Sequence, residues 1–129
     1  SVASLPFVKE AVEDTVKLVP KEQVIVGIPF YTRVWTTSGG QTTSKAVSMQ
    51  TAIDQLNSDG QVALWNDDCA QYVASYSVGS STRQIWFEEE KSLEAKLKVI
   101  QENNVAGVAG WKLGLEKSTV WPVISQYNK

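Results

Sequence analysis

Three side chains that can bind a sugar follow two runs of small or β-branched residues. The run VIVGIPFY, residues 24–31, closes with Tyr31, and Arg33 comes two positions later. In the stretch GVAGWKLGLE, small residues lead directly to Trp111. An indole stacks on the C–H face of a sugar ring, while a phenol and a guanidinium reach hydroxyl groups. The pattern predicts a carbohydrate contact built from these residues.

Side-chain alternation groups these residues on shared faces. Alternate residues of a strand point to the same side. Two sets therefore share a face: Gly107, Ala109 and Trp111 in one run, and Ile25, Gly27, Pro29, Tyr31 and Arg33 in the other. Both sets change from small to large residues toward the carboxyl end of the strand, where an α/β barrel carries its ligand-binding residues.

The other tryptophans have less specific surroundings. Trp35, just past Arg33, is a candidate substrate contact, with packing as the alternative. A core position is the alternative for Trp111 as well, because indoles are buried on average. For the same reason Trp65 and Trp86 are expected to lie in the core of their segment, with a sugar platform as the alternative. Trp121, which precedes Pro122 at a helix start, is also expected to pack.

The acidic clusters and the single cysteine are expected to have structural roles and no catalytic one. Residues 88–90 are three glutamates before a helix, and they predict surface charge that complements the helix N-terminus. Asp67-Asp68 predicts a turn. Cys69 has no partner for a disulfide and is expected to be a partly buried hydrophobe. Without any histidine, a zinc site would lack its usual nitrogen ligands and histidine-activated nucleophiles are excluded, and we predict no metal and no cofactor.

The composition is that of one globular unit. The 129 residues are 43% hydrophobic and 20% charged, with a net charge of −2. This suffices for one modest core. The lysines are scattered among acids, so no nucleic-acid partner is predicted. No apolar run approaches the roughly 20 residues of a membrane span, so no membrane partner is predicted either.

Apolar periodicity predicts alternating helices and strands. Helices are expected over residues 5–19, 49–56, 93–100 and 120–127, with Ser4 and Ser48 as caps of the first two. Residues 24–31 and 107–111 are expected to be strands buried on both faces, residues 36–45 a loop, and residues 61–87 antiparallel strands with turns. Two parallel-type strands with helical crossovers indicate part of a larger βα layout.

Three motifs, in this order and spacing, resemble a known family. They are IPFYTR at residues 28–33, QIWFEE at 84–89 and GVAGWKLGLE at 107–116. Together they are similar to the C-terminal portion of glycoside hydrolase family 18, the chitinase-like (β/α)8 barrels. Within that family the likeness is greatest to bacterial cell-wall and spore-cortex glycosidases.

The resemblance implies an α/β fold with an insertion. Residues 1–35 and 88–129 would form the C-terminal segment of a TIM barrel, strands seven and eight with their helices, and residues 36–87 would form a small α+β insertion. Tyr31 and Arg33 would contact the substrate. Trp111 would form the floor of the subsite that holds the sugar to be cleaved. The partner would be an N-acetylglucosamine-containing polysaccharide, peptidoglycan or chitin, at an extracellular, cell-wall or spore-envelope location of a bacterium.

The family's acidic motifs are missing from this chain. No aspartate is followed by another three residues later, so D-x-x-D-x-E does not occur. In this family the substrate's own N-acetyl oxygen acts as nucleophile in a retaining mechanism, and an acid stays necessary. We therefore expect no catalytic residue in this chain and an inactive 129-residue fragment. Unpaired barrel edges predict a homo-oligomer. The alternatives are a non-catalytic carbohydrate-binding module and a structural domain.

Overall fold

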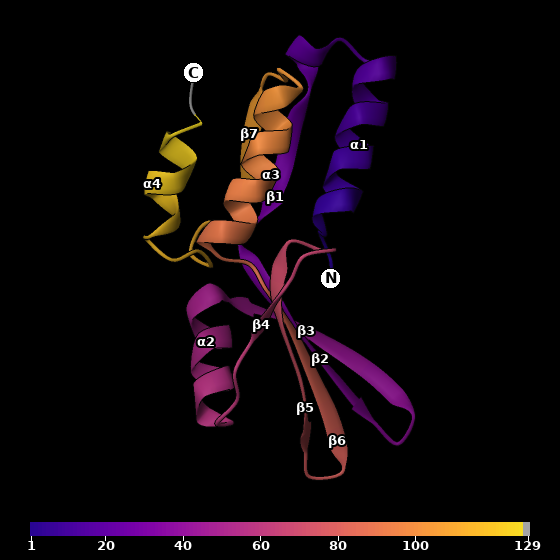
Figure 1. Cartoon of the computed structure of the whole chain (residues 1–129), viewed down its shortest axis with the longest axis vertical. Helices are drawn as coiled ribbons and strands as arrows, with labels where there is room; N and C mark the ends of the chain where they lie inside the picture. Colours follow the sequence, from indigo (N-terminus) through magenta and orange to yellow (C-terminus); the bar gives the residue numbers. More distant parts are fainter. Residues whose placement is uncertain (128–129) are drawn as a thin grey trace.

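The computed structural model describes residues 1–127, which form two parts of different architecture (Figure 1). The helices are α1 (Leu5–Leu18), the 3₁₀ helix η1 (Lys21–Gln23), α2 (Met49–Ser58), α3 (Glu90–Glu102) and α4 (Val120–Ser125). The strands are β1 (Ile25–Pro29), β2 (Tyr31–Ser38), β3 (Gln41–Ser48), β4 (Leu64–Asn66), β5 (Gln71–Val78), β6 (Ser81–Phe87) and β7 (Gly107–Trp111). One part holds β1 and β7 with α1, α3 and α4, and the other holds β2 to β6 with α2.

Strands β1 and β7 pair in parallel and end at the same level. Ile25 is paired with Gly107 at the start, and Pro29 is paired with Trp111 at the end. The parallel relation of the two runs is thereby confirmed. It brings the carboxyl ends of both strands together, as the positioning of a shared site requires.

The helices of this part bury one face of the strand pair. Val8 and Val12 of α1 lie one turn apart and face the core. They pack with Ile28, Phe30, Leu93, Leu97, Ile100, Val120 and Ile124. Ser4 occupies the N-cap position of α1, as predicted, but its side chain makes no capping hydrogen bond.

The prediction that residues 24–31 form a strand buried on both faces was wrong. Strand β1 ends at Pro29, and within residues 1–127 it pairs with β7 alone. The side chain of Ile25 is 66% exposed. Burial on both faces needs a layer on each side, and here helices cover one side only.

The prediction of a loop at residues 36–45 was also wrong. These residues form most of the hairpin of β2 and β3, with Ser38 paired with Gln41. Gly39 and Gly40 take φ values of 55° and 77°, which suits a two-residue hairpin turn. Threonines, which favour strands, flank the turn on both sides. The glycine pair therefore marks a reversal between strands.

The five-stranded sheet has the order β3-β2-β6-β5-β4, and its neighbouring strands are antiparallel. The antiparallel strands predicted within residues 61–87 are confirmed as β4, β5 and β6. The predicted cap of α2 is also confirmed, since the Ser48 hydroxyl accepts a hydrogen bond from Thr51 N at 3.0 Å. Helix α2 covers one face, where its Ala52 and Leu56 pack against Ala74, Ile85 and Phe87 of the sheet. No helix within residues 1–127 covers the other face (Figure 1).

No helix in the described part of the chain combines the length and the apolar character needed to cross a bilayer.

Candidate functional site

Trp111 lies at the exit of β7 with its side chain 70% exposed. Its carbonyl oxygen accepts a hydrogen bond from Phe30 N at 2.7 Å, which joins the ends of the two parallel strands. The peptide bond between Trp111 and Lys112 is cis. Within residues 1–127, most of the Trp111 side chain is therefore accessible.

A hollow of about 230 Å³ brings Trp111 and Tyr31 together. Its other lining residues are Ala3, Gly27, Ile28 and Pro29. The small side chains at the base of the strands leave this space open, since a Cβ placed on Gly27 would meet no atom within 4 Å. An exposed indole beside a phenol can hold a sugar ring by stacking and by a hydrogen bond.

Arg33 lies one step farther from Trp111, on β2. It shares with Tyr31 a small hollow that also contains Trp86 and Glu88. The Arg33 guanidinium donates to Ser44 Oγ at 2.7 Å and lies 5.9 Å from the centre of the Trp35 ring. These contacts hold the guanidinium over the sheet, so Arg33 extends the site along β2 instead of reaching the space beside Trp111.

Backbone hydrogen bonds fix the five-stranded sheet to the strand pair. Leu5 N, at the start of α1, donates to Cys69 O at 2.9 Å. Met49 N, at the start of α2, donates to Leu115 O at 2.8 Å, just after β7. With the bond from Phe30 to Trp111, these contacts set the position of Tyr31 relative to the indole.

A buried ion pair lies behind Tyr31 and Arg33. Lys96 Nζ donates to both oxygens of Glu88, at 2.9 and 2.8 Å, and both side chains are buried. The Glu88 carboxylate also accepts from Gln71 Nε2 and, at 3.0 Å, from Ser92 Oγ. Glu88 N donates to Thr32 Oγ1 at 3.1 Å. The pair thus links α3 to strands β2 and β5.

The prediction of surface charge for residues 88–90 was wrong for Glu88. Burial raises the pKa of Glu88 to about 7, although Lys96 lowers it. Glu89 does serve the helix N-terminus, as the N-cap in a capping box with Ser92. One signal in the sequence was available: Lys96 falls on the apolar stripe of α3, beside Leu93, Leu97 and Ile100.

The prediction that Trp65 and Trp86 belong to the core under α2 was wrong. Both rings are half-buried, and neither is part of that cluster. The Trp65 ring lies 3.7 Å from Lys91 Nζ, and its N–H donates to Asp67 at 2.8 Å. Trp121 does pack, edge-on against Phe30 with ring centres 5.6 Å apart.

The predicted turn at Asp67-Asp68 and the half-buried state of Cys69 are confirmed. The Asn66 side chain accepts from Cys69 N at 2.8 Å and closes this turn.

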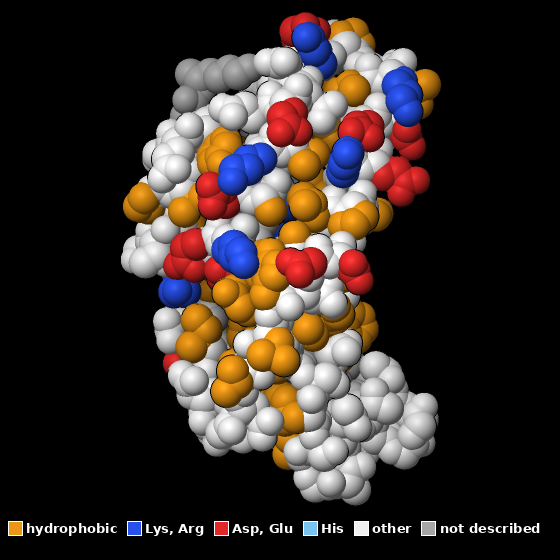
Figure 2. Space-filling view, in the orientation of Figure 1, with side chains coloured by type: hydrophobic (Ala, Val, Ile, Leu, Met, Phe, Trp, Pro, Cys, Tyr) orange, Lys and Arg blue, Asp and Glu red, His pale blue; other side chains and the backbone are white. Residues whose placement is uncertain are grey.

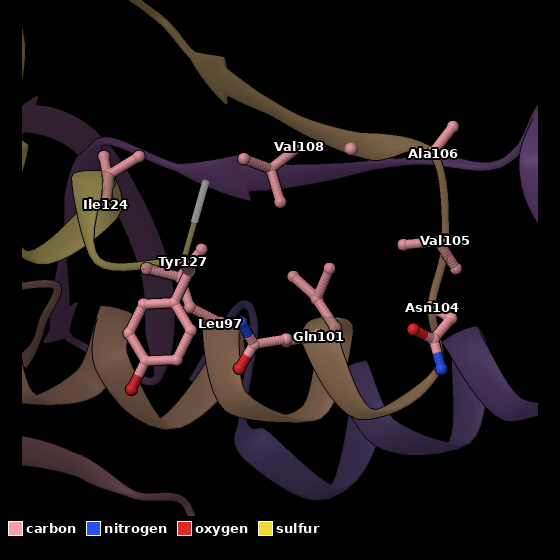
Figure 3. A pocket seen from close by; sticks show the side chains of 10 residues that line it. Leu97, Gln101, Asn104, Val105, Ala106, Val108, Ile124 and Tyr127 are labelled. Atoms are coloured by element: carbon pink, nitrogen blue, oxygen red, sulfur yellow. The ribbon is translucent and has the colours of Figure 1, made fainter. Parts of the chain in front are cut away.

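A different hollow, of about 190 Å³, lies between α3, α4 and β7 (Figure 3). Val108, Ile124 and Tyr127 point into it. Val108 alternates with Ala109 along β7, so this space lies on the opposite side of the strand from Trp111. Its lining holds no Asp, Glu, Lys or Arg, and we interpret it as a gap in helix packing.

The hollow beside Trp111 contains no carboxylate among its lining residues. Glu88, which lines the neighbouring hollow, has both oxygens engaged by Lys96. No cluster of three metal-ligating side chains occurs in the described residues. Within residues 1–127, the arrangement offers an exposed indole and a phenol that can contact a sugar, but no free acid beside them.

Comparison with known proteins gives a family and several relatives. Residues 3–116 match the family described as Glycosyl hydrolases family 18. The chain is 32% identical to the cortical fragment-lytic enzyme of Bacillus subtilis (strain 168), over 99% of this chain and 31% of that protein. It aligns with the spore cortex-lytic enzyme SleL of Bacillus megaterium QM B1551 at a TM-score of 0.86 and 28% identity, over 98% of this chain and 30% of that one.

A chitinase from Chromobacterium violaceum ATCC 12472 shares the fold at a TM-score of 0.86 and 17% identity, over 97% of this chain and 39% of that one. The chain spans about a third of the length of the relatives it matches. Its α/β fold therefore corresponds to a C-terminal portion of the family 18 barrels. Since the family match extends over most of its length, the chain belongs to the glycosyl hydrolases of family 18.

Proposed function

We propose that this chain is the substrate-binding C-terminal part of a family 18 glycosidase that acts on N-acetylglucosamine-containing polysaccharide, peptidoglycan or chitin. The observation that carries the proposal is the shared hollow of Trp111 and Tyr31 at the carboxyl ends of β1 and β7. Peptidoglycan is the favoured substrate, because the Bacillus relatives are a cortical fragment-lytic enzyme and a spore cortex-lytic enzyme.

The residues present indicate which steps of the reaction this chain supports. In a substrate-assisted retaining mechanism, the N-acetyl oxygen attacks the anomeric carbon while an acid protonates the leaving oxygen. Trp111 holds the ring from one face, and Tyr31 reaches its polar edge. The acid comes from outside this chain, since no carboxylate lines the hollow. The 129 residues alone are therefore inactive.

Substituting Trp111 in the whole enzyme tests this proposal. We expect Trp111→Ala to lower kcat/KM on an N-acetylglucosamine oligomer about 30-fold, or about 2 kcal/mol, the effect of removing a dominant tryptophan contact. Leu113→Ala is the matched control, because Leu113 is an equally exposed apolar side chain two residues later. Unchanged turnover together with a lower Tm for Trp111→Ala would assign the indole to packing and refute the proposal.

A non-catalytic carbohydrate-binding module is the second candidate, favoured by the absence of a carboxylate in the Trp111 hollow. Titration of the 129-residue chain with soluble oligosaccharides, followed by tryptophan fluorescence, separates the two. A module of this kind binds on its own, whereas part of a cleft binds feebly.

We also propose a bacterial cell-wall or spore-envelope location and self-association through the open side of β1. The location is supported by the cortex-lytic relatives. Self-association is supported by Ile25 and Phe7, whose side chains are 66% and 61% exposed beside an apolar hollow of about 240 Å³. An unpaired strand next to exposed apolar side chains favours pairing with another copy.

A further inference from the structure

The direction of the Trp111 side chain depends on the backbone on either side of it. The indole is 70% exposed, so its own packing restrains it little. On the β1 side, the Trp111 carbonyl oxygen is held by Phe30 N at 2.7 Å. On the other side the chain enters residues 112–119, which lead to α4 and which we call the exit loop. The path of the exit loop therefore affects where the indole points.

Hydrogen bonds within the exit loop make its first half one unit. Leu115 N donates to Lys112 O at 3.3 Å, and Gly114 N donates to Glu116 Oε2 at 2.8 Å. Gly114 takes a φ of 91°, which residues with a side chain rarely adopt. A shift of the second half of the loop is therefore passed on to Lys112, the residue next to Trp111.

The middle of the exit loop is anchored to the start of α2. Met49 N donates to Leu115 O at 2.8 Å, and Lys117 N donates to Met49 Sδ at 3.4 Å. Ser48, just before Met49, is paired with Tyr31 across β2 and β3. The loop is thus set against the strand that carries Tyr31, which lines the same hollow as the indole.

The end of the exit loop is anchored by Glu90, in the first turn of α3. Glu90 Oε1 accepts hydrogen bonds from Lys117 Nζ, at 3.0 Å, and from the hydroxyl of Thr119. Thr119 occupies the N-cap position of α4, yet its side chain makes no capping hydrogen bond. Because its hydroxyl is turned to Glu90 instead, this contact holds the loop against α3 and does not cap α4.

The carboxylate of Glu90 stays charged in these surroundings. Burial raises the pKa of Glu90, but its hydrogen bonds, first of all the one from Thr119, outweigh this and leave the pKa below its usual value. Hydrogen bonds to an ionised group are roughly twice as strong as those between neutral groups. The side chains of Glu90 and Lys117 are 29% and 26% exposed, so salt screens this pair less than a pair on the open surface.

The Glu90 contact differs from the other ion pairs of these helices. In Figure 2 acidic and basic side chains gather over α1 and α3 on the side in view. The pair of Glu94 and Lys98, like the pairs on α1, lies within a single helix. Glu90 and Lys117 are 27 residues apart in the sequence and join α3 to the exit loop. Such a contact fixes the position of one segment relative to another.

We propose that Glu90 is a positioning residue for Trp111, because it holds the exit loop through Lys117 and Thr119 and thereby sets the direction of the indole. This inference rests on the proposed function, in which Trp111 holds the sugar. Glu90 does not line the hollow beside Trp111. It therefore acts on the substrate only through the indole.

A double-mutant cycle in the whole enzyme tests this role. We expect Glu90→Ala to lower kcat/KM on a soluble N-acetylglucosamine oligomer about fivefold, because a displaced indole holds the sugar in a less productive position. In a Trp111→Ala background the same substitution should change kcat/KM by less than about twofold, since two residues that act through one contact are not additive.

Glu94→Ala is the matched control. Glu94 lies one turn later on α3, and its carboxylate also binds a lysine and a hydroxyl, those of Lys98 at 3.2 Å and Tyr127 at 3.3 Å. Neither partner belongs to the exit loop, so kcat/KM should stay within about twofold of the unsubstituted enzyme.

Thr119→Val removes one of the two donors to Glu90 and keeps the shape of the side chain. It should cause a smaller loss of kcat/KM that also disappears in the Trp111→Ala background, and the cycle is run with this variant if Glu90→Ala does not fold. Equal losses with and without the indole would show a general structural role and overturn the proposal. Unchanged kcat/KM in the variants of the loop contact would overturn it too.

The behaviour of Trp111→Ala alone separates this inference from the proposed function. If that variant loses activity and the loss from Glu90→Ala adds to it in full, only the positioning role fails. If Trp111→Ala leaves kcat/KM unchanged, the proposed function fails and the positioning role fails with it.

Discussion

Glu88 and Lys96 form the one ion pair in residues 1–127 with both side chains buried. Removing two charges from water costs several kcal/mol each, and only close contacts with further hydrogen bonds offset this. Here the contacts come from Lys96, Ser92 and Gln71. Loss of one partner leaves the other charge buried and unpaired, whereas loss of both does not.

The Lys96→Met variant should therefore lower the free energy of unfolding by about 3 kcal/mol at pH 8, because the buried carboxylate of Glu88 loses the ammonium group that offsets its burial. Adding Glu88→Gln, which removes the remaining charge, should recover most of this loss. Urea denaturation of the three proteins measures both effects. A double variant as unstable as the single one would contradict the role of the unpaired charge.

The pH dependence of stability should change in the Glu88→Gln variant. Burial raises the pKa of Glu88 from 4.5 to about 7 in the folded chain. Between these values the folded state binds more protons than the unfolded state, so the free energy of unfolding falls as pH rises from about 4.5 to about 7. Glu88→Gln lacks this contribution, so on going from pH 4.5 to pH 7 its free energy of unfolding should fall less, or rise more, than that of the unsubstituted protein.

At the scale of elements, β7 depends on a glycine that lets an aromatic ring approach. A Cβ added to Gly110 would lie 2.2 Å from Phe30 Cε2. Phe30 is buried and also contacts Trp121, so its ring has little room to move. The ring of Phe30 therefore lies against Gly110 of β7 and Trp121 of α4, one residue before Trp111.

We expect Gly110→Ala to lower the free energy of unfolding by about 2 kcal/mol through overpacking. Gly107→Ala is the matched control, since it lies on the same strand and its added Cβ would meet nothing within 4 Å. Thermal unfolding of both variants measures the difference. Equal Tm values would show that Phe30 relaxes without cost.

Elements with local signals were predicted well, and those that depend on neighbours were not. Helix α2 follows from Ser48 and from the spacing of its apolar residues, all within one short segment. The burial of β1 was mispredicted, because apolar composition cannot tell which side lacks a covering layer. The hairpin at Gly39-Gly40 was missed because polar strands with an exposed face resemble loops in composition.

At the scale of the whole molecule, the strand pair has one covered face and an open side. Strand β1 pairs only with β7 in residues 1–127, and Ile25 beside it is 66% exposed. We expect the 129-residue chain to self-associate at micromolar concentration, as measured by light scattering. Ile25→Lys should reduce the mass by placing a charge at the interface, and Leu18→Lys is the control at an exposed helix end. A monomeric unsubstituted chain would contradict the prediction.

The sequence by itself determined the family likeness, the parallel strand pair and Tyr31, Arg33 and Trp111 as candidate contacts, because strand alternation and motif order are local properties. Only the tertiary structure decided which of these share a space. Tyr31 lies beside Trp111, whereas Arg33 is turned along β2 toward Trp35 and Trp86. It also placed Glu88 against Lys96, eight residues away across a helix start. Such contacts depend on how a second sheet docks onto the first, and no short stretch of sequence records that geometry.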